Sequence, residues 1–139
     1  MKQTKNHLIG GITGGIGSEL AVKLSAEGDS VAGYARKAAA GDSFSPQDGF
    51  MLKTCDATEP EALETVINEF QKELGSIDSY THAIGSIYLR PAHLTPVEDW
   101  LQTIQTNLSS AFYALRSVTK IMSKQGHGNC LFFSTAAAQ

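Results

Sequence analysis

The sequence predicts a three-layer α/β fold, in which a parallel sheet of five strands is flanked by helices. Along the 139 residues, short apolar stretches alternate with segments whose apolar residues recur every three or four positions. A glycine-rich turn stands between the first strand and the first helix, and such sheets bind ligands beyond the carboxyl ends of their strands. A chain of this length suits one domain with one sizeable core.

The first half of the chain supplies three of the strands. The first begins at Leu8 and Ile9, and the following helix has a predicted buried stripe of Ile16, Leu20 and Leu24 that ends near Gly28. The second strand is predicted over 30–35 and the third over 50–54, with a loop over 38–49 between them.

Two threonines are predicted to cap the later helices. Thr58 with Glu61, and Thr95 with Glu98, have the spacing of a capping box, and Pro60 suits a first helical turn. The second helix has an apolar face that Gly75 ends, and the long third helix has one stripe that ends before Gly126. These faces are Leu63, Val66, Ile67, Phe70 and Leu74, then Leu101, Ile104, Leu108, Ala111, Leu115, Val118 and Met122. The fourth strand is predicted over 77–84 and the fifth over 130–134.

The glycine-rich turn carries the strongest functional signal. Gly11, Gly15 and Gly17 have a G-x-x-x-G-x-G spacing, which suits a tight turn, a close approach to a pyrophosphate and close helix–strand packing. The helix that begins near Gly15 directs free N–H groups at the turn, where they would bind a phosphate. Taken alone, this spacing also fits a plain tight turn. Its position between strand and helix favours a dinucleotide-binding site, and residues 1–139 are predicted to form a single NAD(P)-binding Rossmann domain.

Composition excludes several other classes. The formal net charge of −3, with no lysine or arginine run, argues against nucleic-acid binding. Cys55 and Cys130 lie in apolar segments and are interpreted as reduced, buried thiols rather than a disulfide. The four histidines are scattered without metal-ligand spacing, as surface, loop or strand-end residues, so no metal is expected. No signal peptide or run of ~18 apolar residues occurs, which favours a soluble, cytoplasmic protein without a membrane partner.

The residues around the turn resemble the classical short-chain dehydrogenases/reductases, which carry Thr-Gly-x-x-x-Gly-Ile-Gly where this chain has Gly10 to Gly17. The resemblance extends over the whole chain. It assigns adenine contact to Asp56, and it matches residues 82–85 to the family's Asn-Asn-Ala-Gly. The cofactor-binding residues that it implies are Gly11, Thr13, Gly14, Gly15, Ile16, Gly17, Asp56, Ala57, His82, Ala83, Ile84 and Gly85.

Two catalytic positions follow from the same resemblance. Asn107 looks like the family's mid-helix asparagine, which holds a water and a local backbone distortion in a proton relay. The alternative is a polar residue on a solvated face. Thr135 takes the position of the family's serine, where its hydroxyl would contact a substrate carbonyl, and Ser134 is the alternative. The chain departs from the family at Gly10, at His82-Ala83 and at Thr135.

The resemblance implies hydride transfer between a nicotinamide and a small-molecule carbonyl or secondary alcohol, as in a 3-oxoacyl-type reductase. The family's Tyr-x-x-x-Lys pair, which supplies the general acid/base, is absent from residues 1–139. The chain therefore looks like the N-terminal cofactor half of a longer enzyme and is predicted to be inactive alone. A protein that senses NADP without catalysis is the alternative, which the gene sequence beyond codon 139 would distinguish.

The cofactor is predicted to be NADP(H). NAD-binding domains place an acidic residue at the end of the second strand, whereas this chain has Arg36 and Lys37, which would attract a 2′-phosphate. The alternative for both cations is a solvated strand end. A homo-oligomer, dimer or tetramer, is expected, because the aromatic fifth strand would be an open edge and the family commonly pairs subunits through the long helix.

Overall fold

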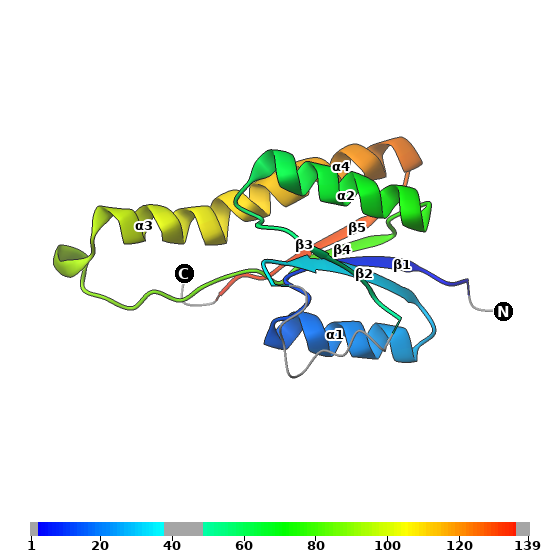
Figure 1. Cartoon of the computed structure of the whole chain (residues 1–139), viewed down its shortest axis with the longest axis horizontal. Helices are drawn as coiled ribbons and strands as arrows, with labels where there is room; N and C mark the ends of the chain where they lie inside the picture. The colour runs from blue at the N-terminus through cyan, green and yellow to red at the C-terminus, as the bar shows by residue number, and fades with distance from the viewer. Residues whose placement is uncertain (1–2, 38–48, 136–139) are drawn as a thin grey trace.

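The fold is a five-stranded parallel sheet between two layers of helices (Figure 1). The computed structural model describes residues 3–37 and 49–135. The strand order is β3-β2-β1-β4-β5. The strands are β1 (Asn6–Gly10), β2 (Ser30–Ala35), β3 (Met51–Thr54), β4 (Ser79–His82) and β5 (Asn129–Phe132). The predicted three-layer α/β fold with five strands is confirmed.

The two faces of the sheet bury different helices. Helix α1 (Gly15–Ala26) covers one face, where Ala21 packs with Ile9, Ile12 and Val31. The other face is covered by α2 (Pro60–Leu74) and α4 (Ser110–Gln125) (Figure 1). Its core consists of Leu8, Ala32, Tyr34, Cys55, Ala57, Leu63, Ile67, Phe70, Ile77, Tyr80, Ala114, Val118, Ile121 and Met122. Successive strand residues point to opposite faces, and all residues of β1 and β2 after the first are buried, so both faces of these two strands are covered.

The polar fourth strand is shorter than predicted, and its polar groups have partners. The Asp78 carboxylate, just before β4, accepts a 2.8 Å hydrogen bond from the backbone N–H of Asn6. The hydroxyl of Ser79 contacts Nδ1 of His7 at 2.5 Å, and Nε2 of His7 lies 3.1 Å from Asp29. These bonds join the amino ends of β1, β2 and β4. The predicted third and fifth strands also differ from the structure by one or two residues at their ends, and the predicted loop lies almost wholly outside the described residues.

Neither predicted capping box forms. The N-cap of α2 is Glu59, and the hydroxyl and N–H of Thr58 both donate to the Asp56 carboxylate in the turn before it. The N-cap of α3 (Val97–Ile104) is Pro96, and the Thr95 hydroxyl instead donates to the carbonyl of Pro91 in the turn that contains η2 (Ala92–Leu94). The threonine hydroxyls therefore serve neighbouring turns. The predicted helix ends are correct, since Gly28, Gly75 and Gly126 have positive φ.

The predicted long helix is three segments with two different faces. A π-helix, η3 (Gln105–Ser109), joins α3 to α4. The single predicted stripe is wrong, because Leu101 and Leu108 are 56% and 63% exposed while Val118 and Met122 are buried. A π turn adds a residue and rotates the pattern that follows it. Figure 1 also shows α3 projecting beyond the labelled strands, in keeping with the exposure of Trp100 and Leu101 on this helix.

Ile16 is not part of a buried stripe either, since it is 58% exposed. The buried residues of α1 are Gly17 and Ala21, and Leu20 and Leu24 pack at the edge of the cluster. Gly17 determines this orientation, because a Cβ there would overlap the carbonyl of Gly11. The helix therefore turns its glycine, and not Ile16, toward the first strand.

Candidate functional site

The glycine turn follows β1 at the carboxyl edge of the sheet. Gly11 has a φ of 78°, and a Cβ on it would lie 2.7 Å from the carbonyl oxygen of Ala83. Its N–H donates to the carbonyl of Tyr34, while its carbonyl accepts from the N–H of Gly14. Gly14 is the N-cap of α1, and no side chain among residues 3–37 and 49–135 caps this helix end. The first N–H groups of α1, from Gly15 and Ile16 onward, are thus directed at solvent beside the turn, where an anion would bind.

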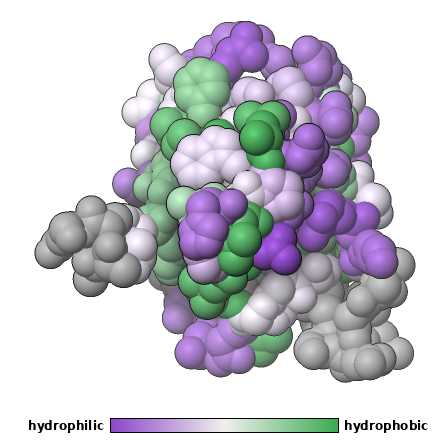
Figure 2. All heavy atoms as spheres, turned by 90° about the vertical axis from the view of Figure 1, so that its left-hand side faces the viewer, coloured by the Kyte–Doolittle hydropathy of each residue, from purple (hydrophilic) through white to green (hydrophobic). Residues whose placement is uncertain are grey.

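A cavity of about 870 Å³ opens beside this turn. This volume is in the range of sites for small molecules and cofactors. The cavity brings together predicted residues from four segments, namely Gly11, Thr13, Gly14, Arg36, Lys37, Asp56, Ala57, Ala83, Ile84 and Gly85. Figure 2 views the molecule from the side on which α3 projects, and apolar side chains are exposed there among polar ones. The remaining predicted residues, Gly15, Ile16, Gly17, His82, Asn107 and Thr135, do not line the cavity.

The ends of β2 and β3 give the cavity a charged wall. Arg36 and Lys37 are exposed directly after β2. The N–H and hydroxyl of Thr58 donate to the Asp56 carboxylate at 2.9 and 2.8 Å and hold its pKa below the usual range, with a smaller effect from Arg36. Burial raises the pKa of the neighbouring Cys55 thiol to about 11, so this thiol is neutral at pH 7. Both cysteines are free, Cys55 buried and Cys130 partly buried.

Asn107 fixes the opposite wall. Its Oδ1 accepts a 2.7 Å hydrogen bond from the N–H of Ser86, and its Nδ2 donates to the carbonyl of Ser86 at 3.0 Å. This reciprocal pair attaches the segment after β4 to the π-helix η3. A Cβ on Gly85 would lie 3.1 Å from Oδ1 of Asn107, which is tighter than ordinary contact. The side-chain amide is therefore committed to the backbone. The backbone distortion that the family resemblance implies at Asn107 is present as a π turn.

His82 lies beneath the site rather than in it. Its side chain is buried, with the residue 4% exposed, and burial lowers the pKa of its ring to about 4. Its ring nitrogens contact the Tyr80 hydroxyl at 2.7 Å and the Ser110 hydroxyl at 3.2 Å. Thr135 is exposed and follows β5 at the same edge of the sheet as the cavity.

Sequence reasoning missed several residues that line the cavity. They are Ala35, Cys55, Thr58, Ser86, Gln102 and Thr106. Thr58 had a usable signal, since Asp56-Ala57-Thr58 has the spacing at which an aspartate accepts from the residue two positions later. Gln102 and Thr106 had none, because their position depends on the π turn.

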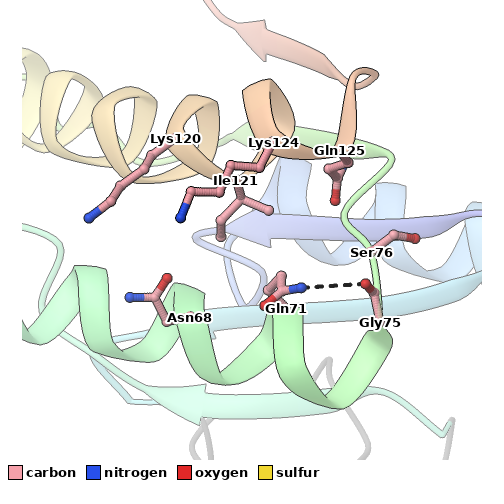
Figure 3. A pocket seen from close by; sticks show the side chains of 8 residues that line it. All are labelled: Asn68, Gln71, Gly75, Ser76, Lys120, Ile121, Lys124 and Gln125. Carbon is pink, nitrogen blue, oxygen red and sulfur yellow. Dashed lines mark hydrogen bonds between the residues drawn. The ribbon is translucent and has the colours of Figure 1, made fainter.

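A second, smaller cavity of about 320 Å³ lies between the end of α2 and α4 (Figure 3). It contains none of the predicted site residues. The side chain of Gln125 on its wall supports the fold, since it bonds both the N–H and the carbonyl of Ile77. Within residues 3–37 and 49–135, no three His, Cys, Asp or Glu side chains gather as a metal site requires. The helices in those ranges all fall short of the length and apolarity needed to cross a bilayer.

The parallel sheet, the glycine turn and the cavity at its carboxyl edge define a Rossmann-type α/β domain. The sequence model of the short chain dehydrogenase family matches residues 5–139, and the chain belongs to this family.

Known relatives are similar over nearly all of this chain. The 3-oxoacyl-(acyl-carrier-protein) reductase FabG of Escherichia coli is 30% identical over 129 residues, which cover 89% of this chain and 52% of the relative. D-threitol dehydrogenase of Mycolicibacterium smegmatis is 26% identical over 136 residues, covering 94% and 52%. The chain thus spans about half the length of these relatives.

Solved structures show the same fold. A short-chain type dehydrogenase/reductase from Mycobacterium marinum has a TM-score of 0.88 at 23% identity, covering 96% of this chain and 57% of that one. An NAD+-bound xylitol dehydrogenase has a TM-score of 0.87 at 24% identity, covering 96% and 54%. ElxO with NADP bound has a TM-score of 0.84 at 23% identity, covering 96% and 56%. The fold is therefore found with either cofactor.

Proposed function

We propose that the chain is the cofactor-binding part of an NADP(H)-dependent oxidoreductase, which transfers hydride between a nicotinamide and a carbonyl or secondary alcohol. The observation that carries this proposal is the pair Arg36 and Lys37, exposed at the wall of the cavity beside the glycine turn. No Asp or Glu stands in residues 30–37 to accept a bond from a ribose 2′-hydroxyl. Two cations at that position would instead attract a 2′-phosphate. The FabG relatives make a 3-oxoacyl compound the first substrate class to test.

The residues divide by the part of the cofactor that they would contact. The N–H groups at the start of α1, beside Gly14 and Ile16, would bind the pyrophosphate. Asp56, already oriented by Thr58, would accept from the adenine, with Ala57 beside it. The backbone of residues 83–85, which lines the cavity, would lie against the nicotinamide half of the cofactor.

Asn107 and Thr135 are assigned to the substrate side. Bound nicotinamide supplies or accepts the hydride. The Thr135 hydroxyl would donate a hydrogen bond to a substrate carbonyl. The side chain of Asn107 is occupied by Ser86, so its part in a proton relay would fall to its backbone carbonyl. Residues 1–139 contain no Tyr-x-x-x-Lys pair, so the general acid/base is assigned to a residue that they do not supply.

Calorimetric titration of the full-length protein with NADP(H) and NAD(H) tests the assignment. A charge-assisted hydrogen bond contributes about 1.5–3 kcal/mol, so Arg36→Ala should weaken NADP(H) binding by ~10–150-fold and leave NAD(H) binding nearly unchanged. Arg116→Ala, an exposed arginine on α4 outside the cavity, is the matched control and should change neither. Equal or tighter binding of NAD(H) by the wild type would overturn the assignment.

The alternative, an NADP-sensing protein without catalysis, is distinguished by turnover. If the full-length protein binds NADP(H) tightly but does not oxidise NADPH with any of a panel of ketones, aldehydes and 3-oxoacyl thioesters, the sensing function is supported and the reductase function is rejected.

We also propose that the protein is a homo-oligomer. Large apolar side chains are exposed along α3, η3 and α4, among them Trp100, Leu101, Leu108 and Phe112. Leu131 of β5 is exposed as well. Large apolar side chains gathered in this way are typical of surfaces that bind protein. Sedimentation at micromolar concentration should show a dimer or tetramer, and a monomer alone would contradict the proposal.

A further inference from the structure

A continuous chain of buried hydrogen bonds crosses the core directly beneath the glycine turn. The hydroxyls of Tyr34 on β2 and Tyr80 on β4 lie 2.7 Å apart, and Tyr80 contacts Nδ1 of His82 at 2.7 Å. Nε2 of His82 lies 3.2 Å from the hydroxyl of Ser110, which lies 2.5 Å from the carbonyl of Thr106. Tyr34, Tyr80 and Ser110 are fully buried. The chain of bonds thus joins the sheet to the π-helix η3.

The direction of every bond follows from its last acceptor. A carbonyl only accepts, so the Ser110 hydroxyl donates to Thr106, and the Ser110 oxygen accepts from Nε2–H of His82. Burial keeps the His82 ring neutral at pH 7, so its Nδ1 carries no proton and accepts from the Tyr80 hydroxyl. The Tyr80 oxygen then accepts from Tyr34. The whole chain requires the Nε2–H tautomer of His82.

The end of this chain lies where the helix is irregular. Thr106 belongs to η3, in which backbone bonds run from i to i+5, and Ser110 stands four positions after it. The Ser110 side chain therefore reaches the carbonyl that an α-helix would pair with the N–H of residue 110. Thr106 itself lines the cavity, and the next residue, Asn107, binds Ser86. A movement of this carbonyl would therefore displace the wall that η3 and Ser86 form, opposite the charged wall.

The Tyr34–Tyr80 end of this hydrogen-bond chain depends on Gly10. A Cβ at Gly10 would lie 2.6 Å from the hydroxyl oxygens of both Tyr34 and Tyr80, far closer than a real Cβ approaches. The tyrosine pair thus requires a glycine at this position. The ring of His82 is held from its other side by Phe132, at 5.5 Å between centroids and 28° between planes.

We propose that His82 is a positioning residue, whose neutral Nε2–H tautomer holds Ser110 against the carbonyl of Thr106 and so fixes the π turn that carries Asn107. The bond chain itself is independent of the reaction, whereas its catalytic consequence rests on the proposed function. The side chains that face His82 are Tyr80 on its own strand, Phe132 on β5 and Ser110 on α4, and Tyr34 lies beyond Tyr80. None of them carries a charge at pH 7.

Solution NMR of the full-length protein without ligand tests the bond chain. The ¹⁵N shifts of His82 should identify the Nε2–H tautomer at pH 7. His82→Phe, which keeps a ring against Phe132, and Ser110→Ala should each speed amide exchange over residues 107–111 by about 2- to 12-fold, the factor for one lost hydrogen bond. Because both variants act through the contact of the Ser110 hydroxyl with the Thr106 carbonyl, the double variant should exceed the larger single effect by little.

Tyr34→Phe is the matched control. It removes a buried hydroxyl of the same chain, but Tyr34 only donates to Tyr80, so the tautomer and the exchange rates over residues 107–111 should stay unchanged. The proposal is overturned if His82 carries its proton on Nδ1, if His82→Phe leaves the exchange unchanged, or if Tyr34→Phe speeds it equally.

The catalytic consequence is measured separately. If the protein is the proposed reductase, His82→Phe and Ser110→Ala should lower kcat while KM for NADPH changes less than twofold, and Tyr34→Phe should change neither. A rise in KM with kcat unchanged would refute the positioning role, even where the NMR results support the bond chain. Absence of turnover in the wild type would instead reject the proposed function and leave the NMR results as the test of His82.

Discussion

Acid should destabilise this fold through one buried histidine. His82 is 4% exposed, and burial lowers its pKa from the usual 6.5 to about 4. In the unfolded chain the same ring takes up a proton near pH 6.5. Between these two values the unfolded state binds a proton that the folded state does not, so the free energy of unfolding falls as the pH falls.

The magnitude follows from the size of the pKa change. One pKa unit corresponds to 1.36 kcal/mol, so the change from 6.5 to about 4 amounts to about 3 kcal/mol. This stability is present in full above pH 6.5, declines through the window between 6.5 and 4, and is lost below about pH 4. Such a loss is a large fraction of the 5–15 kcal/mol that is typical of a domain.

Urea unfolding of the wild type and of His82→Phe at pH 7, 5.5 and 4 measures the effect. Asp56 and Glu64 have lowered pKa values and also destabilise the protein in acid, but they are common to both proteins. The difference between the two free energies of unfolding should therefore change by about 3 kcal/mol from pH 7 to pH 4, to the disadvantage of the wild type. Parallel pH profiles would refute the argument. Where His82→Phe does not fold, direct NMR titration of His82 in the wild type replaces the comparison of variants. A measured pKa near 6.5 would then refute the argument.

Three further predictions concern the site. Gly17→Ala should lower the free energy of unfolding by at least about 2 kcal/mol, because its Cβ meets the Gly11 carbonyl, whereas Gly15→Ala, with nothing within 4 Å, should change it by less than about 1 kcal/mol. Equal effects in urea titrations would contradict this. Asn107→Ala should expose the N–H of Ser86 to faster hydrogen exchange and lower kcat, and unchanged exchange would show that their bonds are not formed in solution. The purified 139-residue chain should not oxidise NADPH with ketones or aldehydes, and turnover comparable to that of a full-length relative would refute this.

The sheet and the glycine turn could be predicted because their signals are local. Gly11 and Gly17 are glycines for reasons of backbone contact within the turn, and these contacts recur wherever a strand joins a helix in this way. The strand order brings the segments that follow β1, β2, β3 and β4 to one cavity. Ten of the predicted residues therefore line it together, although no two of those segments are adjacent in the sequence.

The π turn could not be predicted from periodicity. A stripe that runs from Leu101 to Met122 assumes one regular helix, and a single added residue in η3 places the two halves on different faces. The predicted N-cap of α2 is wrong for a different reason. Thr58 has the right spacing for a cap, but its N–H and hydroxyl both donate to the Asp56 carboxylate two residues earlier, so Thr58 belongs to the turn before the helix and Glu59 is the N-cap.

Two departures from the family pattern become one feature in the structure. Gly10 stands where the family has threonine, and His82 where it has asparagine, so each by itself suggests a weakened site. The hydroxyls of Tyr34 and Tyr80 occupy the space that a side chain at Gly10 would fill. The Tyr80 hydroxyl also donates the hydrogen bond that Nδ1 of His82 accepts. The space beneath the turn is thus filled and its polar groups are paired, by a different set of residues. A substitution in this layer therefore has to be interpreted against its partners, because replacing His82 by an apolar residue would leave the fully buried Tyr80 hydroxyl without the acceptor that it has now.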